Sequence, residues 1–297
     1  MKYYAQIAGF KNLSARDGGC NKLPDNDGLI GNAYYLKHHF YYDVNSKQFK
    51  NEVSKINNID PNALILLEGE ILPSFKNLGP LTNSFIPWSV SYQLKDQREN
   101  ASIVQEICQR RQTYINILKA YTDVLQKPVA LYGRSIDDEF WGYYAFNDKS
   151  PLKDAWINEQ ATWAEEISPY VVGPVVSAQL FHFDSDPVRQ KQLNNGWKTS
   201  VLYRINLAKK LFPNKKVIGH FWPRYHNSAG IMANKFPSNE IAKLRLDTLS
   251  DNCDLISYWD WGGTYWDFDS KEFNWTYFVR NAKRDISRSK NGKNAIE

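Results

Sequence analysis

The sequence contains little cysteine and no long apolar segment, and both shortages narrow the kinds of protein it can encode. Its three cysteines, Cys20, Cys108 and Cys253, lie far apart, so they fit neither a disulfide framework nor the short ligand spacing of a zinc site. No segment reaches the roughly 18 uninterrupted apolar residues of a membrane-spanning helix, and the first residues do not resemble a signal peptide. We therefore expect a soluble protein with no membrane partner, in a compartment that the sequence does not specify.

A glycine-rich phosphate loop and a long run of one charge sign are also missing. No such loop follows a predicted strand, which argues against a bound dinucleotide. The 37 basic and 32 acidic residues leave a formal net charge of +5 and are spread along the chain, so nucleic acid is not an expected partner. We expect no cofactor, and the sequence does not specify an oligomeric state.

Histidine is scarce, with 5 residues, and its distribution argues against a metal centre. A site could be assembled from His182, Asp184, His220 and His226, but none of them shows the short spacing typical of metal ligands. Satisfied polar or surface histidines are the simpler interpretation, so we expect no tightly bound metal. No Gly-x-Ser-x-Gly elbow occurs either, which disfavours a serine hydrolase.

Aromatic residues, in contrast, are abundant. They make up 14% of the chain, with 10 tryptophans and 18 tyrosines. A flat ring with a polar handle suits the face of a sugar. Core packing accounts for most of these residues, so they become informative only where they coincide with another functional signal.

The strongest such signal is the apolar segment Ala63–Leu67, which runs directly into two carboxylates. Five apolar residues without a helical stripe predict a strand buried on both faces. Glu68 and Glu70 follow two positions apart, so on an extended chain both point to one face, with alpha carbons about 6–7 Å apart. An apolar strand that ends in acids is typical of the catalytic mouth of a parallel α/β barrel.

Strand and helix patterns alternate along most of the chain. We expect strands at 3–10, 34–44, 63–67, 129–133, 170–183, 216–222 and 255–263, and helices at 102–126, 150–167, 188–211 and from 237 onward. This alternation predicts a parallel sheet, and at 297 residues it favours a TIM-like (β/α) barrel of seven or eight strands. We expect one catalytic barrel domain over residues 1–282, followed by a polar, basic tail at 283–297.

Nearly every predicted strand ends in a carboxylate or an aromatic residue. These residues are Glu68, Glu70, Asp137, Asp138, Asp184, Trp222, Trp259, Asp260 and Trp261. Glycosidic bond hydrolysis needs an acid that protonates the leaving oxygen, and flat rings hold the sugar beside it. The pattern therefore favours a glycoside hydrolase.

The order of these motifs resembles the hyaluronidase family of bee-venom and sperm type, whose members are (β/α)-barrel glycosidases. The resemblance is an ordered series over roughly residues 60–265: Glu68-Gly69-Glu70 with Pro73, Trp141 to Asp148, Trp163 to Val176, Leu202 to Arg224, and Tyr258-Trp259-Asp260. Glu68 stands where the family has an aspartate, and Trp222 stands where it has a tyrosine.

The resemblance implies a mechanism and a set of site residues. Glu70 would be the general acid, and Glu68 would hold the acetamido group of an N-acetylhexosamine, whose own carbonyl oxygen would be the nucleophile. The expected substrate-binding residues are Trp222, Arg224, Trp259, Asp260, Trp261 and Tyr143. The expected partner is a polysaccharide or other glycan.

Two alternatives stay open beside this interpretation. A conventional two-carboxylate glycosidase would pair Glu70 with Asp137 or Asp138. A carbohydrate-binding barrel without catalysis would keep the aromatic residues but would not need a protonated Glu70, because a barrel fold by itself does not determine function.

Overall fold

The computed structural model describes residues 3–7, 29–36, 46–47, 50–51, 54, 64–68, 101–126, 129–132, 151–222, 224–226, 229–260, 269–270 and 273–274. The chain divides into two compact units. The first comprises Met1–Tyr34, Ser177–Leu202 and Ile218–Glu297, and the second comprises Tyr35–Val176 and Tyr203–Val217.

The first unit contains a parallel sheet in the order β6, β7, β1, β2. Its strands are β6 (Ile218–Phe221), β7 (Leu255–Asp260), β1 (Tyr3–Ile7) and β2 (Leu29–Leu36), and each pairs with its neighbour in parallel. Helix α7 (Asn239–Asn252) connects β6 to β7. Parallel pairing of two consecutive strands requires such a crossover connection, because a short hairpin would reverse the strand direction.

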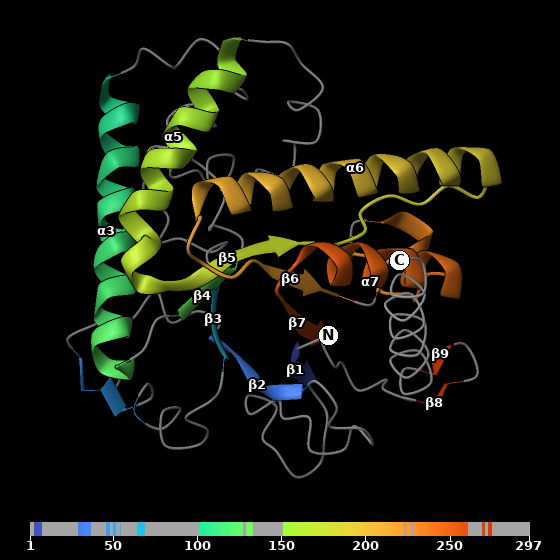
Figure 1. Cartoon of the computed structure of the whole chain (residues 1–297), viewed down its shortest axis with the longest axis horizontal. Helices are drawn as coiled ribbons and strands as arrows, with labels where there is room; N and C mark the ends of the chain where they lie inside the picture. The colour runs from blue at the N-terminus through green and yellow to red at the C-terminus, as the bar shows by residue number, and fades with distance from the viewer. Residues whose placement is uncertain are drawn as a thin grey trace, which may run out of the picture. The chain divides into compact units, whose positions relative to one another are not determined.

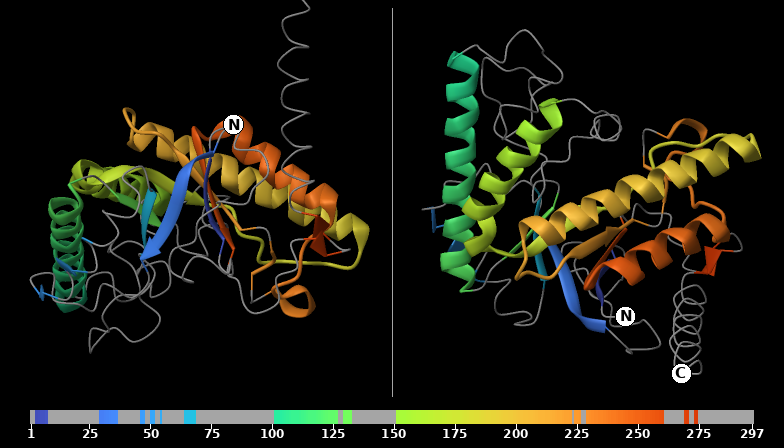
Figure 2. Two further views of the ribbon diagram at one scale, coloured as in Figure 1. Left: turned by 90° about the horizontal axis from the view of Figure 1, so that it is seen from below. Right: turned by 45° about the horizontal axis from the view of Figure 1, so that its top comes forward.

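The second unit contains a smaller parallel sheet in the order β3, β4, β5. Its strands are β3 (Leu64–Glu68), β4 (Val129–Tyr132) and β5 (Val171–Ser177), joined through α3 (Ala101–Leu125) and α5 (Pro151–Ile167). Figures 1 and 2 show α3 and α5 lying side by side. Helix α6 (Pro187–Leu211) follows β5 and contributes residues to both units.

Short elements complete the described chain. They are the 3-10 helices η3 (Ser168–Tyr170) and η4 (Gly230–Met232), and the antiparallel pair β8 (Asp269–Ser270) and β9 (Phe273–Asn274). Within the described residues, no helix is both long and apolar enough to cross a membrane.

Most of the predicted elements are confirmed, and the architecture is α/β with parallel strands and helical connections. The predicted second strand at 34–44 overlaps β2 only in its first residues, because β2 occupies Leu29–Leu36 and pairs with β1 from Leu29 onward, and residues 37–44 lie outside the described residues. Gly31 and Asn32 lie inside β2 and are weak strand formers, which hid the strand from sequence inspection. The closed barrel, the single domain over 1–282 and the tail at 283–297 stay predictions.

Strands β4 and β6 and the first residues of β3 are buried. Every residue of β4 and of β6 is buried, and so are Leu64, Ile65 and Leu66 of β3. Parallel sheets covered on both sides characteristically have such uninterrupted apolar strands. Polar and charged groups are thereby confined largely to strand ends and connections, which is where the candidate site lies.

In the second unit, α3 packs on α5 through an aromatic and ionic contact. The Arg111 guanidinium lies 5.6 Å from the centroid of the Trp163 ring, and its Nε donates to Glu166 Oε2 at 2.7 Å. Tyr114 packs against the same indole, with ring centroids 6.2 Å apart. Cation–π contact and a charge-assisted hydrogen bond together fix the register of the two helices.

At Gly173 of β5, another backbone segment approaches closely. A Cβ atom built there would lie 1.9 Å from the carbonyl oxygen of Lys216. Backbone atoms cannot move aside as the end of a side chain can, so this position accepts only hydrogen.

We expect Gly173→Ala to lower the free energy of unfolding by roughly 3 kcal/mol or more, because the added methyl must displace backbone. Gly219→Ala is the matched control, since its Cβ would meet only side-chain atoms of Leu249 and Cys253 at 3.0 Å. Urea unfolding measures both variants. Equal losses for the two would contradict the close backbone approach at Gly173.

Candidate active site

The carboxyl ends of β6, β7 and β1 lie at one edge of the sheet in the first unit. Phe221, the last residue of β6, pairs with Tyr258, and Gln6 and Ile7 of β1 pair with Trp259 and Asp260. Because all three strands run in the same direction, Trp222 leaves the sheet at the edge where β7 ends with Trp259 and Asp260. Three of the predicted substrate-binding residues therefore share one edge.

The acid pair belongs to the second unit. Glu68 is the last residue of β3 and pairs with Tyr132, the last residue of β4. It thus ends a parallel strand at its carboxyl end, as the sequence predicts. Glu70, Asp137, Asp138, Tyr143 and Trp261 lie outside the described residues, so their proposed roles stay predictions.

Trp222 is packed into protein. Only 4% of its surface is exposed, and its ring meets the His226 ring edge to face, with centroids 5.7 Å apart. His226 in turn makes a T-shaped contact with Phe181 at 4.7 Å. The result is a row of three rings, Trp222, His226 and Phe181, of which the last two are half-buried. Burial lowers the pKa of His226, which favours its neutral form.

Arg224 is held by contacts within the same connection. Its guanidinium lies 4.0 Å from the centroid of the Phe236 ring, and its Nη1 donates to the carbonyl oxygen of Asn234 at 2.7 Å.

His220 is a buried residue of β6. It pairs across the strands with Ser257, its Nδ1 is 3.4 Å from Ser257 Oγ, and both residues are buried. Burial lowers the pKa of His220 from 6.5 to about 3, so the ring is neutral at physiological pH. A neutral, enclosed imidazole suits a core polar pair better than a general acid.

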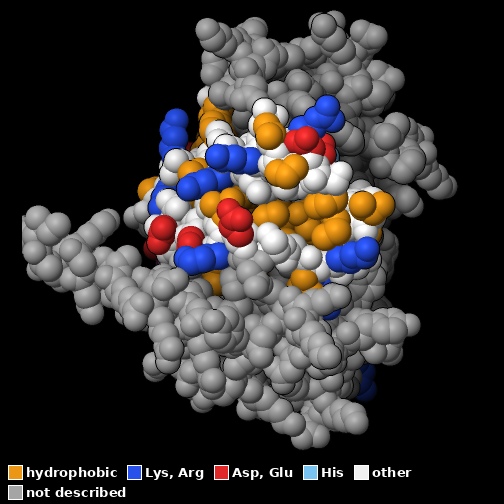
Figure 3. All heavy atoms as spheres, turned by 90° about the vertical axis from the view of Figure 1, so that its right-hand side faces the viewer, with side chains coloured by type: hydrophobic (Ala, Val, Ile, Leu, Met, Phe, Trp, Pro, Cys, Tyr) orange, Lys and Arg blue, Asp and Glu red, His pale blue; other side chains and the backbone are white. Residues whose placement is uncertain are grey.

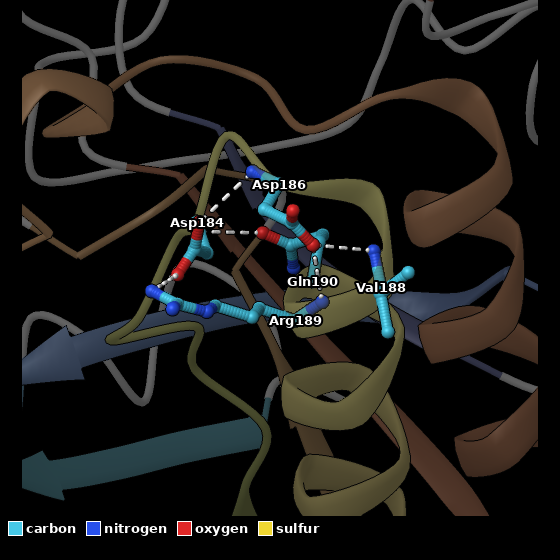
Figure 4. Close-up of polar contacts among 5 residues, drawn as sticks. All are labelled: Asp184, Asp186, Val188, Arg189 and Gln190. Atoms are coloured by element: carbon cyan, nitrogen blue, oxygen red, sulfur yellow. Dashed lines mark hydrogen bonds and ion pairs between the residues drawn. The ribbon is translucent and has the colours of Figure 1, made fainter.

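The acids after β5 form the N-terminal cap of α6 (Figure 4). Asp186 Oδ1 accepts from the backbone N–H groups of Val188 and Arg189 at 2.9 and 3.0 Å. Asp184 Oδ1 accepts from Asp186 N–H at 2.9 Å, and Gln190 Oε1 accepts from Asp184 N–H at 2.9 Å. The Asp186 carboxylate therefore satisfies two of the first N–H groups of the helix, and Asp184 holds the residue before it. Among the described residues, no group of three His, Cys, Asp or Glu side chains could hold a metal ion.

One residue near this edge was missed by the sequence analysis. Arg245 of α7 is fully buried, although arginine in a helix is normally exposed. The available signal was its position four residues after Ile241 and four before Leu249, in the middle of the helix's buried stripe. A charge in such a stripe needs a specific partner.

Two solved structures are similar to this chain at low sequence identity. The chain is similar to the monoclinic crystal structure of bee venom hyaluronidase, with 12% identity, a TM-score of 0.41, and coverage of 76% of this chain and 69% of that chain. A second structure, bee venom hyaluronidase in complex with a hyaluronic acid tetramer, gives 13% identity and a TM-score of 0.42 at the same coverage. No protein-family model matches the sequence, and no curated protein matches it.

The surface of the described residues carries charges of both signs. Figure 3 shows lysine and arginine side chains interspersed with acidic and hydrophobic ones on one face. Among the described residues, the large hydrophobic side chains that are exposed are Val188, at 67%, and Ile231, at 74%. This mixture agrees with the absence of a single-sign charge run in the sequence.

Asp186→Ala should destabilise the protein by about 1 kcal/mol, because two N–H groups of α6 lose their acceptor. Asp186→Asn is the control, since its side-chain oxygen can accept the same bonds. Urea unfolding at neutral pH compares the two. If the alanine and asparagine variants are equally stable, Asp186 does not act as the cap.

His220 makes stability depend on pH in a predictable direction. The folded protein holds His220 neutral down to about pH 3, whereas the unfolded chain binds the proton below 6.5. Stability is therefore complete above that higher pH and falls on acidification, by up to about 1.4 kcal/mol per pH unit between the two pKa values.

His220→Gln tests this linkage, because the glutamine side chain does not titrate. Urea unfolding over a pH series measures how the free energy of unfolding changes with pH. Between the two pKa values, this slope should be smaller in the variant than in wild type by an amount that corresponds to nearly one bound proton. The comparison uses slopes, so a general loss of stability in the variant does not affect it. Parallel slopes would exclude His220 as the source.

Proposed function

We propose that the chain is a glycoside hydrolase with a (β/α) barrel of seven or eight parallel strands, and that it cleaves an N-acetylhexosamine-containing polysaccharide. The observation that carries this proposal is the strand register in the first unit. Phe221 pairs with Tyr258, so Trp222 leaves β6 at the edge where Trp259 and Asp260 end β7. Aromatic and acidic residues at the carboxyl edge of parallel strands suit sugar binding and catalysis.

Glu70 is the proposed general acid. It follows β3 by two residues, and Glu68 ends that strand. Two neighbouring carboxylates disfavour each other's ionisation, so one of them stays protonated at a higher pH than an isolated glutamate. A protonated Glu70 can deliver its proton to the glycosidic oxygen as the bond to the anomeric carbon breaks.

The second half of the proposal is nucleophilic assistance from the substrate. The acetamido carbonyl oxygen attacks the anomeric carbon, Glu68 orients and polarises the acetamido group, and water then opens the resulting ring. Support for this scheme comes from the motif Glu68-Gly69-Glu70 and from its resemblance to the hyaluronidase acid motif. In the alternative, Asp137 or Asp138 supplies the second carboxylate.

The aromatic residues would hold the sugar. Trp259, Trp261 and Tyr143 are proposed to contact substrate through ring faces, and Arg224 and Asp260 through hydrogen bonds. Trp222 is largely enclosed by protein and packs on His226. Its proposed contribution is therefore to shape the edge of the site as well as to contact the glycan.

The test is Glu70→Gln, which keeps the size and hydrogen bonding of the side chain but cannot donate the proton. Turnover should fall by about a hundredfold or more while glycan binding persists. The measurement is a reducing-sugar assay on hyaluronan, chondroitin, chitin and peptidoglycan fragments.

Glu165→Gln is the matched control, because Glu165 is an exposed glutamate on α5. It should retain wild-type turnover. Equal activity of wild type and Glu70→Gln on any cleaved substrate would rule out Glu70 as the acid. A wild type that binds a glycan without cleaving it would favour the carbohydrate-binding alternative.

A further inference from the structure

The strand ladder of the first unit is interrupted at the candidate site. Beyond β5 the chain continues beside β6, where Ala178 N–H donates to His220 O at 3.1 Å. Two residues later, Leu180 pairs in parallel with Tyr225, and Leu180 O accepts from His226 N–H at 2.7 Å. An unbroken parallel register would place position 223 opposite Leu180. Tyr225 stands there instead, so the chain between Phe221 and Tyr225 is longer than an unbroken register requires. We call this stretch the bulge.

This bulge begins with Trp222 and includes Arg224, two of the residues proposed to act at the site. Bulges interrupt backbone pairing and change the direction in which side chains point, and they are frequent beside active sites. An interrupted ladder also leaves carbonyl oxygens that need another donor. The structure supplies that donor from α7.

Arg245 binds the carbonyl oxygens on both sides of the interruption. Its Nη2 donates to Ala178 O and, at 2.7 Å, to Trp222 O. The two acceptors belong to segments far apart in sequence, the continuation of β5 and the start of the bulge. The guanidinium thus ties the two segments together.

The surroundings of Arg245 are built to hold a charge. The side chain is fully buried, and its guanidinium lies 4.8 Å from the Phe221 ring centroid and 5.9 Å from that of Trp197. The Trp197 indole N–H donates to Gln179 O at 3.1 Å, so this ring is anchored to the same segment. Burying a guanidinium has a large desolvation cost, which carbonyl and cation–π contacts offset.

We propose that Arg245 is a positioning residue for the candidate site: its guanidinium fixes the bulge and thereby sets the position of the Trp222 side chain. This inference rests on the proposed function for its catalytic consequence. The route is short, because the bond is to the backbone carbonyl of Trp222 itself. Trp222 then contacts His226, and His226 contacts Phe181.

The geometry also predicts why lysine cannot substitute fully. Arginine presents several N–H groups in a rigid plane, and that plane can stack on an aromatic ring while its edge donates to carbonyls. The ammonium group of lysine keeps the charge, but its N–H groups all come from one nitrogen at the end of a shorter side chain. In Arg245→Lys, we therefore expect the fold to be kept more fully than the position of the Trp222 side chain.

The experiment compares Arg245→Met and Arg245→Lys with wild type. Lys243→Met is the matched control, because Lys243 lies on the same helix, is exposed, and pairs with Asp247 at 2.8 Å. The first readout is the fluorine NMR spectrum of protein labelled with 5-fluorotryptophan. Among the 10 tryptophans, the Trp222 resonance is assigned by its absence in Trp222→Phe.

We expect Arg245→Met to shift or broaden the Trp222 resonance and Lys243→Met to leave it unchanged. On a cleaved glycan, KM should rise by about tenfold in Arg245→Met while kcat changes by less than about threefold, because the proposed effect acts through Trp222 and not through the proposed acid. Arg245→Lys should give an intermediate resonance shift and an intermediate KM.

An unchanged Trp222 resonance in folded Arg245→Met would overturn the proposal, as would a fall in kcat without a rise in KM. Far-UV circular dichroism shows whether Arg245→Met folds. If it does not, Arg245→Lys is the test, and a Trp222 resonance and a KM equal to those of wild type would exclude Arg245 as a positioning residue. A wild type that cleaves no glycan refutes the proposed function alone. The fluorine resonance still determines whether Arg245 positions Trp222.

Discussion

The burial of parallel strands such as β4 and β6 is the constraint on which the described structure depends. Each residue of β4 and β6 is shielded from water, so a polar side chain inside these strands must be neutral or hydrogen-bonded. Within each of the two sheets, the parallel strands finish at one edge, where side chains no longer have to fit into an apolar core. In the first unit, Trp222, Trp259 and Asp260 stand at that edge.

His220 and Arg245 show two different solutions to that constraint. Imidazole can give up its proton, and its burial beside Ser257 holds it neutral. Guanidinium stays protonated under all ordinary conditions, so Arg245 needs acceptors, and it finds them in the carbonyl oxygens of Ala178 and Trp222. His220 and Ser257 therefore form a neutral polar pair in the core. Arg245 connects a helix to the interrupted ladder beside the candidate site.

Much of this fold could be predicted from the sequence, because the alternating strand and helix patterns give the bounds of α3, α5 and α6 and the start of α7 closely. Strand β2 could not, since its glycine and asparagine break the apolar pattern, and the two-residue strands β8 and β9 are too short to show one. The sequence predicted that Trp222 and Trp259 end strands, but only the register places them at one edge. The bulge and its arginine depend on contacts between distant segments, which periodicity does not encode.

The contact at Gly173 has a consequence for evolutionary comparison. Because a Cβ there would meet the carbonyl oxygen of Lys216 at 1.9 Å, any relative that keeps this spacing must keep glycine at the corresponding position. Natural selection can vary the aromatic and acidic residues at the strand ends to suit new substrates, whereas this site tolerates no exchange. In distant homologues, a glycine early in the strand after α5 would therefore serve as a fixed point for alignment where overall identity has decayed.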